Sequence, residues 1–172
     1  MATARIQHDF DCGEAALWQV FFFDEEYNRR LYLDTLRFPV WKVLDQKVTD
    51  ATLERRVEIH PVVENLPGPL KALIGDHFHY IEDGRLDRKT NRYSFRVLPS
   101  ALADKTQISG EMYPERLGDA RCRRIIDYKV DVKVMIIGKL AEQKTIQDTQ
   151  SSYERAAIFT RTYLKEKGLT TT

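Results

Sequence analysis

The sequence predicts an α+β protein in which a curved antiparallel sheet of about six to seven strands wraps around one long C-terminal helix. The first observation is that residues 121–134 alternate between apolar and polar side chains, as a strand does. Residues 139–167 then read as one helix, which Gly168 ends. The second observation is that the earlier segments are short and joined by short polar turns, which favours an antiparallel meander over alternating βαβ units. A sheet with one apolar face needs a cover, and only the final helix is long enough to supply it.

The composition excludes several classes of protein. The 172 residues contain 27 Lys and Arg against 26 Asp and Glu, a net charge of +1, so we expect no nucleic-acid partner. The length suits a single domain over residues 1–172, with its core in residues 5–167. Two cysteines, Cys12 and Cys122, make no disulfide framework. Because the sequence shows neither a bilayer-length apolar run nor a leader pattern, we expect a soluble cytoplasmic protein.

The N-terminal part predicts a strand followed by two short helices. Residues 5–10 form the strand, with Ile6, His8 and Phe10 on one face. Residues 14–23 carry apolar side chains at helical spacing. The acidic residues 24–26 begin a second helix, because negative charge is favourable at a helix N-terminus. This helix ends before Pro39, since the residue preceding a proline avoids the helical conformation.

The middle of the chain predicts the rest of the sheet. The expected strands cover residues 40–49, 52–60, 78–86, 92–98 and 106–113, before the strand at 121–134. Residues 87–91 form an evident hairpin connection. The clearest alternation lies in residues 52–60, where Leu53, Val57 and Ile59 share one face with Arg55.

The final helix has an apolar stripe whose middle is unusually small. The stripe runs through Ile137, Ala141, Thr145, Thr149, Ser152, Ala156, Phe159 and Tyr163. A packed core helix normally shows Leu and Ile there, so this helix is expected to leave space above the sheet. A rotation that turned Ile146 and Tyr153 inward would shrink the space. The tail from Thr170 to Thr172 is expected to fray.

Two local motifs and the order of the elements carry a resemblance to a known superfamily. One motif is the strand-to-helix junction IIGKLAE at residues 136–142, and the other is the hairpin beginning YIEDG at residues 80–84. Over residues 5–167 the chain resembles the START-like, or helix-grip, superfamily (SRPBCC) of lipid transfer domains, pollen allergens and polyketide cyclases, including its bacterial and sterol-binding members. The resemblance implies a hydrophobic ligand held between sheet and helix. It does not imply one reaction, because the scaffold hosts both carriers and enzymes.

Aromatic and apolar residues of the strands, together with the small residues of the helix, are the expected lining of this ligand site. They are Phe78, Tyr80, Tyr93, Phe95, Met112, Ile126, Tyr128, Thr149, Ser152, Ala156 and Phe159. The alternative is a filled core, which aromatic residues at alternating positions also produce. Buried tyrosine hydroxyls need partners, and a ligand headgroup could supply them.

Three charged residues, Arg55, Arg124 and Glu82, share the parity of the apolar strand residues. Buried charges are costly unless they are paired, so these side chains are expected to form an internal ion pair or to meet a polar headgroup. The alternative is that β-bulges shift the register and turn them toward solvent.

The sequence offers little support for metal or nucleophilic chemistry. His77 and His79 stand at i and i+2, but on the face opposite Phe78 and Tyr80, so we expect no metal site. Nucleophile motifs and glycine-rich phosphate loops are absent. We therefore predict no cofactor and no assigned catalytic residue, although Glu82 or a tyrosine could act as an acid or base.

An apolar segment between two strands is expected to control access to the ligand site. Leu66, Leu70, Leu73 and Ile74 lie in this stretch, which begins with two prolines and ends at Gly75. It could form a short helix or a flap, and exposed leucines there could touch a membrane surface transiently. The alternative is a packed helix that caps the sheet.

These patterns lead to one functional prediction and two alternatives. The prediction is that the protein binds or transfers a hydrophobic or amphiphilic, lipid-like small molecule without covalent chemistry. The first alternative is a cyclase or dehydratase that uses the same site. The second is an interaction module whose interior is filled with side chains.

Overall fold

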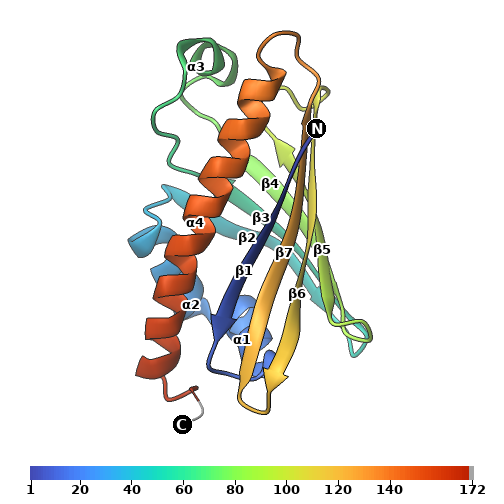
Figure 1. Ribbon diagram of the computed structural model, residues 1–172, viewed down its shortest axis with the longest axis vertical. Coiled ribbons are helices and arrows are strands. Elements are labelled where there is room, and N and C mark those ends of the chain that lie inside the picture. Colours follow the sequence, from blue (N-terminus) through green and yellow to red (C-terminus); the bar gives the residue numbers. More distant parts are fainter. Residues whose placement is uncertain (171–172) are drawn as a thin grey trace.

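The computed structural model describes residues 1–170, which form a seven-stranded antiparallel sheet packed against a long C-terminal helix and several short helices (Figure 1). The strand order is β1-β7-β6-β5-β4-β3-β2. Strands β2 to β7 therefore make a meander, and β1 adds to its last strand. The strands are β1 (Ala2–Phe10), β2 (Val40–Val48), β3 (Thr52–His60), β4 (Tyr80–Asp87), β5 (Arg92–Pro99), β6 (Thr106–Gly118) and β7 (Arg121–Val132). Thr171 and Thr172, part of the tail expected to fray, lie outside the described residues.

The helices confirm the predicted order of elements. They are α1 (Glu14–Phe23), α2 (Glu25–Arg29), the π-helical turn η1 (Arg30–Thr35), α3 (Gly68–Ile74) and α4 (Gly138–Glu166). Figure 1 shows α4 running along the sheet, with α1 and α2 at one end of the molecule and α3 at the other. The α+β helix-grip prediction is correct. The expected second helix was one element in the sequence but forms α2 followed directly by η1.

Glycine explains where α4 begins and ends. A Cβ at Gly138 would collide with the carbonyl oxygen of Val132, so the strand-to-helix junction requires a glycine. The backbone N–H of Val132 donates to Glu142 Oε1 at 2.9 Å, which ties the first turn of α4 to the end of β7. Gly168 has φ +64° and stops the helix, as left-handed glycines often do.

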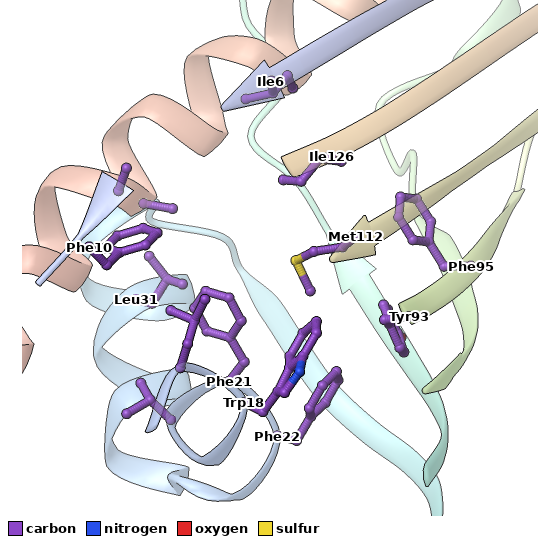
Figure 2. Packing of buried hydrophobic residues seen from close by; sticks show 14 of the residues in the cluster. Ile6, Phe10, Trp18, Phe21, Phe22, Leu31, Tyr93, Phe95, Met112 and Ile126 are labelled. Atoms are coloured by element: carbon purple, nitrogen blue, oxygen red, sulfur yellow. The ribbon is translucent and has the colours of Figure 1, made fainter. Parts of the chain in front are cut away.

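Aromatic residues gather in the core where α1 packs against the sheet. Trp18, Phe21 and Phe22 of α1 face Tyr93 of β5 and Met112 of β6 (Figure 2). The Phe22 ring stacks on Trp18 at 5.3 Å and contacts Tyr93 at 5.0 Å between centroids. This aromatic layer closes one end of the space between α4 and the sheet.

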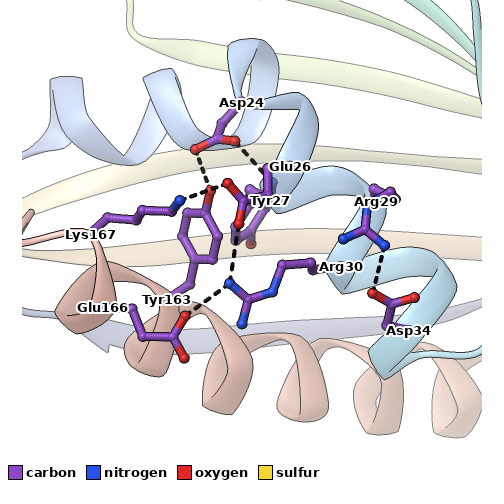
Figure 3. A network of polar contacts seen from close by, with 9 residues as sticks. All are labelled: Asp24, Glu26, Tyr27, Arg29, Arg30, Asp34, Tyr163, Glu166 and Lys167. Carbon is purple, nitrogen blue, oxygen red and sulfur yellow. Dashed lines mark hydrogen bonds and ion pairs between the residues drawn. The ribbon is translucent and has the colours of Figure 1, made fainter.

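Polar contacts fasten the C-terminal end of α4 to α2 and η1 (Figure 3). The Tyr163 hydroxyl donates to Asp24 Oδ2 at 2.7 Å, and Lys167 Nζ lies 2.6 Å from Glu26 Oε2. Arg30 Nη1 also pairs with Glu166 Oε2 at 2.9 Å. These contacts join segments more than a hundred residues apart and hold the last turns of α4 in place.

In the part of the chain that the structure describes, no helix combines the length and the apolar character needed to cross a membrane.

Candidate ligand pocket

A pocket of about 280 Å³ lies between the sheet and α4. Its lining is mainly aromatic and aliphatic, with a few polar groups, as is usual for small-molecule sites. Helix α4 contributes residues from Ala141 to Ala156. At a rise of ~1.5 Å per residue this is roughly 22 Å of helix, so the pocket is long and narrow.

The structure brings most of the predicted ligand-site residues to this pocket. Those on its surface are Arg55, Phe78, Tyr80, Glu82, Tyr93, Phe95, Met112, Arg124, Tyr128, Thr149, Ser152 and Ala156. The face of α4 turned to the sheet therefore carries the small residues of the stripe. Tyr153 lines the pocket as well, so part of the narrowing foreseen for a rotated helix is present.

Two predicted residues lie elsewhere. Ile126 is fully buried in the core, paired in register with Ile6 of β1 and Met112 of β6 (Figure 2). Phe159 packs against Tyr27 and Tyr163, with ring centroids 5.6 and 5.8 Å away. Strand parity and helical spacing placed both on the inner face, but they do not reveal which inner residues a second layer of side chains covers.

Two glycines allow the aromatic residues of β5 to lie across the sheet. A Cβ at Gly84 would overlap the Tyr93 hydroxyl, and one at Gly110 would stand 2.5 Å from Phe95 Cζ. Both glycines lie opposite Phe95 on the neighbouring strands. The rings therefore fill the space that side chains would otherwise occupy.

Glu82 is a partly buried acidic group of the pocket, on the sheet side. It accepts a hydrogen bond from the Tyr93 hydroxyl at 2.9 Å. Burial raises the pKa of this carboxyl, although Arg55 and the Tyr93 hydrogen bond both act in the opposite direction. Burial dominates because the low dielectric of the interior penalises the charged form.

Arg55 reaches the end of α1 from β3. Its Nη1 donates to the carbonyl oxygen of Phe21 at 3.2 Å, and its guanidinium lies 4.8 Å from the Phe22 ring centroid. The side chain is only 8% exposed. The bulges of the sheet lie in β2 and near the end of β6, so β3 keeps the register that points Arg55 inward.

Arg124 reaches the same end of the pocket from β7. Its Nη2 lies 3.0 Å from Nδ1 of His8, whose Nε2 is 2.9 Å from Glu154 Oε2. A guanidinium can only donate, so His8 Nδ1 accepts and the imidazole is neutral with its proton on Nε2. Burial, followed by the charge of Arg124, lowers the pKa of His8.

Several lining residues were missed because they come from the short helices. Phe21, Tyr27, Leu31 and Tyr32 enter the pocket from α1, α2 and η1. Their helical spacing indicated a buried side but not what it faces. His8 was placed on the inner face of β1, and this parity was the available signal for its contact with Arg124.

The predicted access segment folds as α3, beginning after Pro67 and ending at Gly75 with φ +70°. Leu66, Leu70 and Ile74 line the pocket, whereas Leu73 lies outside the lining and is 40% exposed. The segment is therefore a short helix that contributes one face to the pocket.

The pocket contains charged and hydrogen-bonding groups that can bind a polar group or transfer a proton. Among residues 1–170, no three His, Cys, Asp or Glu side chains gather as a metal site would require. Lys144 and Asp148 of α4 line the pocket and pair with each other at 2.6 Å. The unpaired charges thus concentrate at the α1 end.

A family profile described as "Protein of unknown function (DUF2505)" matches residues 5–164. The chain belongs to the DUF2505 family. A comparison with curated protein sequences finds no match.

Solved structures place this DUF2505 member in the START-like fold. A START superfamily protein from Mycobacterium smegmatis has a TM-score of 0.56 at 11% identity, covering 95% of this chain and 97% of that one. The Zhui aromatase/cyclase from Streptomyces sp. R1128 has a TM-score of 0.61 at 12% identity, with 95% and 96% covered. Norcoclaurine synthase from Thalictrum flavum, in complex with dopamine and hydroxybenzaldehyde, has a TM-score of 0.60 at 14% identity, with 91% and 84% covered. The resemblance predicted from the sequence is confirmed at the level of the fold.

Proposed function

We propose that the protein binds, and passes on, a hydrophobic lipid-like small molecule held between the sheet and α4. The observation that carries this proposal is the long pocket with its mainly apolar lining. Phe78, Tyr80, Phe95 and Tyr128 would surround the apolar body. Apolar surface removed from water supplies the binding free energy, and a few polar groups orient the ligand.

Helix α3 would control access, and its end of the molecule would touch a membrane during exchange. Leu73 of α3 is exposed, and so are Met135 and Ile136 in the connection that leads into α4. Both segments lie at the same end of the molecule (Figure 1). Exposed apolar side chains of this kind are suited to transient contact with lipid.

The test is to look for a copurifying ligand and then to block the pocket. Native mass spectrometry and organic extraction of the purified protein should reveal one bound amphiphile. Ser152→Phe should abolish its recovery because the ring would fill the space beneath α4, whereas Ser151→Phe, on the exposed side of the same turn, should retain it. Protein that is always ligand-free and binds no lipid in vitro would contradict the proposal.

One observation favours an enzyme as the second candidate. Glu82 combines a raised pKa, a tyrosine partner and a place in the pocket, which is a pattern of acid–base groups. A cyclase or dehydratase would then act on the bound molecule. Turnover of an aromatic polyketide that falls by about a hundredfold or more in Glu82→Gln, but not in the exposed Glu54→Gln, would support catalysis. No turnover in the unmodified protein would leave binding as the function.

A further inference from the structure

Two buried guanidinium groups lie at the α1 end of the pocket, and both contact Phe21. Arg55 of β3 and Arg124 of β7 are 8% and 2% exposed, and both line the pocket. They approach α1 from different parts of the sheet. Arg55 binds the Phe21 carbonyl oxygen, and the Arg124 guanidinium lies 5.3 Å from the Phe21 ring centroid.

Neither guanidinium has a full set of partners. Among the described residues, the Nε of each has no hydrogen-bond partner, and the hydrogen bonds of the Nη atoms go to a carbonyl oxygen and to an imidazole, not to a carboxylate. Rings flank them, including Phe22 beside Arg55 and Tyr153 beside Arg124. Such stacking holds the guanidinium planes but supplies neither an acceptor for Nε–H nor a countercharge.

The charges at this end leave an excess of positive charge. Glu82 lines the pocket and interacts with the charge of Arg55, but burial favours its protonated form. His8, the partner of Arg124, is neutral, and Glu154 beyond it has a side chain 62% exposed to water. Two arginines therefore face at most one internal carboxylate. An uncompensated buried charge is costly, so a ligand that neutralises it gains affinity.

We propose that this arginine pair receives the carboxylate of a single-chain amphiphile whose tail lies along α4. The inference rests on the proposed binding function and specifies its ligand class. A ligand carboxylate offsets one of the two positive charges and can accept from the guanidinium N–H groups with charge-assisted hydrogen bonds. The pocket's length of roughly 22 Å along α4 and its small volume favour one extended chain over a bulky ring system.

The experiment compares two probes that differ only in the headgroup. The neutral fluorophore N-phenyl-1-naphthylamine is bound to delipidated full-length protein and displaced with dodecanoate or with dodecan-1-ol. Dodecanoate should bind about tenfold or more tightly than the alcohol, because it alone offers charged hydrogen-bond acceptors to the arginines.

Variants assign this preference to the arginine pair. Arg124→Met and Arg55→Met should each reduce the ratio of the two affinities toward one by weakening dodecanoate alone. Arg56→Met is the matched control, because Arg56 follows Arg55 on β3 but is exposed and pairs with Asp83 on the outer face. If Arg124→Met does not fold, Arg124→Lys replaces it. The lysine variant keeps the charge but loses the planar guanidinium, so it should retain only part of the preference for dodecanoate.

The outcomes separate the inference from the function on which it rests. Equal displacement by both probes in unmodified protein would overturn the carboxylate assignment and leave hydrophobic binding intact. A preference for dodecanoate that survives in both arginine variants would also overturn it. If the fluorophore and both probes fail to bind, the proposed function itself fails.

Discussion

At the scale of single residues, His8 shows how a side chain outside the pocket lining sets the chemistry inside it. Its ring separates the buried Arg124 from the exposed Glu154, and each ring nitrogen has one partner. Protonation would place a second positive charge beside Arg124. The neutral ring therefore keeps Arg124 oriented without neutralising it.

The lowered pKa of His8 makes a prediction about stability and pH. In the unfolded chain the ring protonates near its ordinary pKa of about 6.5, whereas the folded protein holds it neutral to lower pH. The unfolded state thus binds more protons between the two values, and stability falls as pH drops below about 6.5. Above that pH the contribution of His8 is fully present.

Chemical denaturation at a series of pH values measures this effect. The free energy of unfolding of the unmodified protein should decrease between about pH 7 and the folded-state pKa of His8. His8→Gln should remove this part of the pH dependence while retaining a polar side chain, and His77→Gln, at an exposed position before β4, is the control. An identical pH profile for His8→Gln and the unmodified protein would rule out the contribution.

At the scale of elements, the pocket depends on two glycines, one in β4 and one in β6, that have no side chain. Gly84 and Gly110 leave room for the rings of Tyr93 and Phe95, which lie across the neighbouring strands. Tyr93 can then reach Glu82, two residues before Gly84 on β4. The hydrogen bond between Tyr93 and Glu82 therefore depends on the absence of a side chain at position 84.

Gly84→Ala should displace Tyr93 and break its hydrogen bond to Glu82. Inserting a methyl group into a packed site typically costs ~1–3 kcal/mol in the free energy of unfolding. Gly118→Ala is the control, because a Cβ there would meet no atom within 4 Å and its φ is not positive. Urea denaturation checks the difference, and equal stability of the two variants would show that the ring moves aside without cost.

At the scale of the whole molecule, α4 spans the two ends of the pocket. Its first turns are tied to β7 through Glu142, and its last turns to α2 and η1 through Tyr163 and Lys167. The Tyr27 hydroxyl lies 2.7 Å from the buried Thr160 Oγ1 and adds an internal link. With both ends fastened, the small residues between them are held above the sheet instead of collapsing onto it.

The order of elements and the inner face of each strand could be predicted from sequence. Alternation has a period of two, so Arg55, Glu82 and Arg124 were placed inward by parity alone, and regular β3, β4 and β7 kept them there. Gly138 indicated where the strand gives way to the final helix, and Gly168 indicated where that helix ends. These are local properties, decided by backbone sterics and neighbouring residues.

Only the tertiary structure decided which inward residues border open space and which are covered. Ile126 and Tyr128 share one face of β7, yet the first is covered in the core and the second lines the pocket. The contacts of His8 with Arg124, and of α1 with both arginines, join segments far apart in the chain. Periodicity specifies the face toward which a side chain points. Whether that side chain meets open space or another residue depends on how elements distant in the sequence pack together.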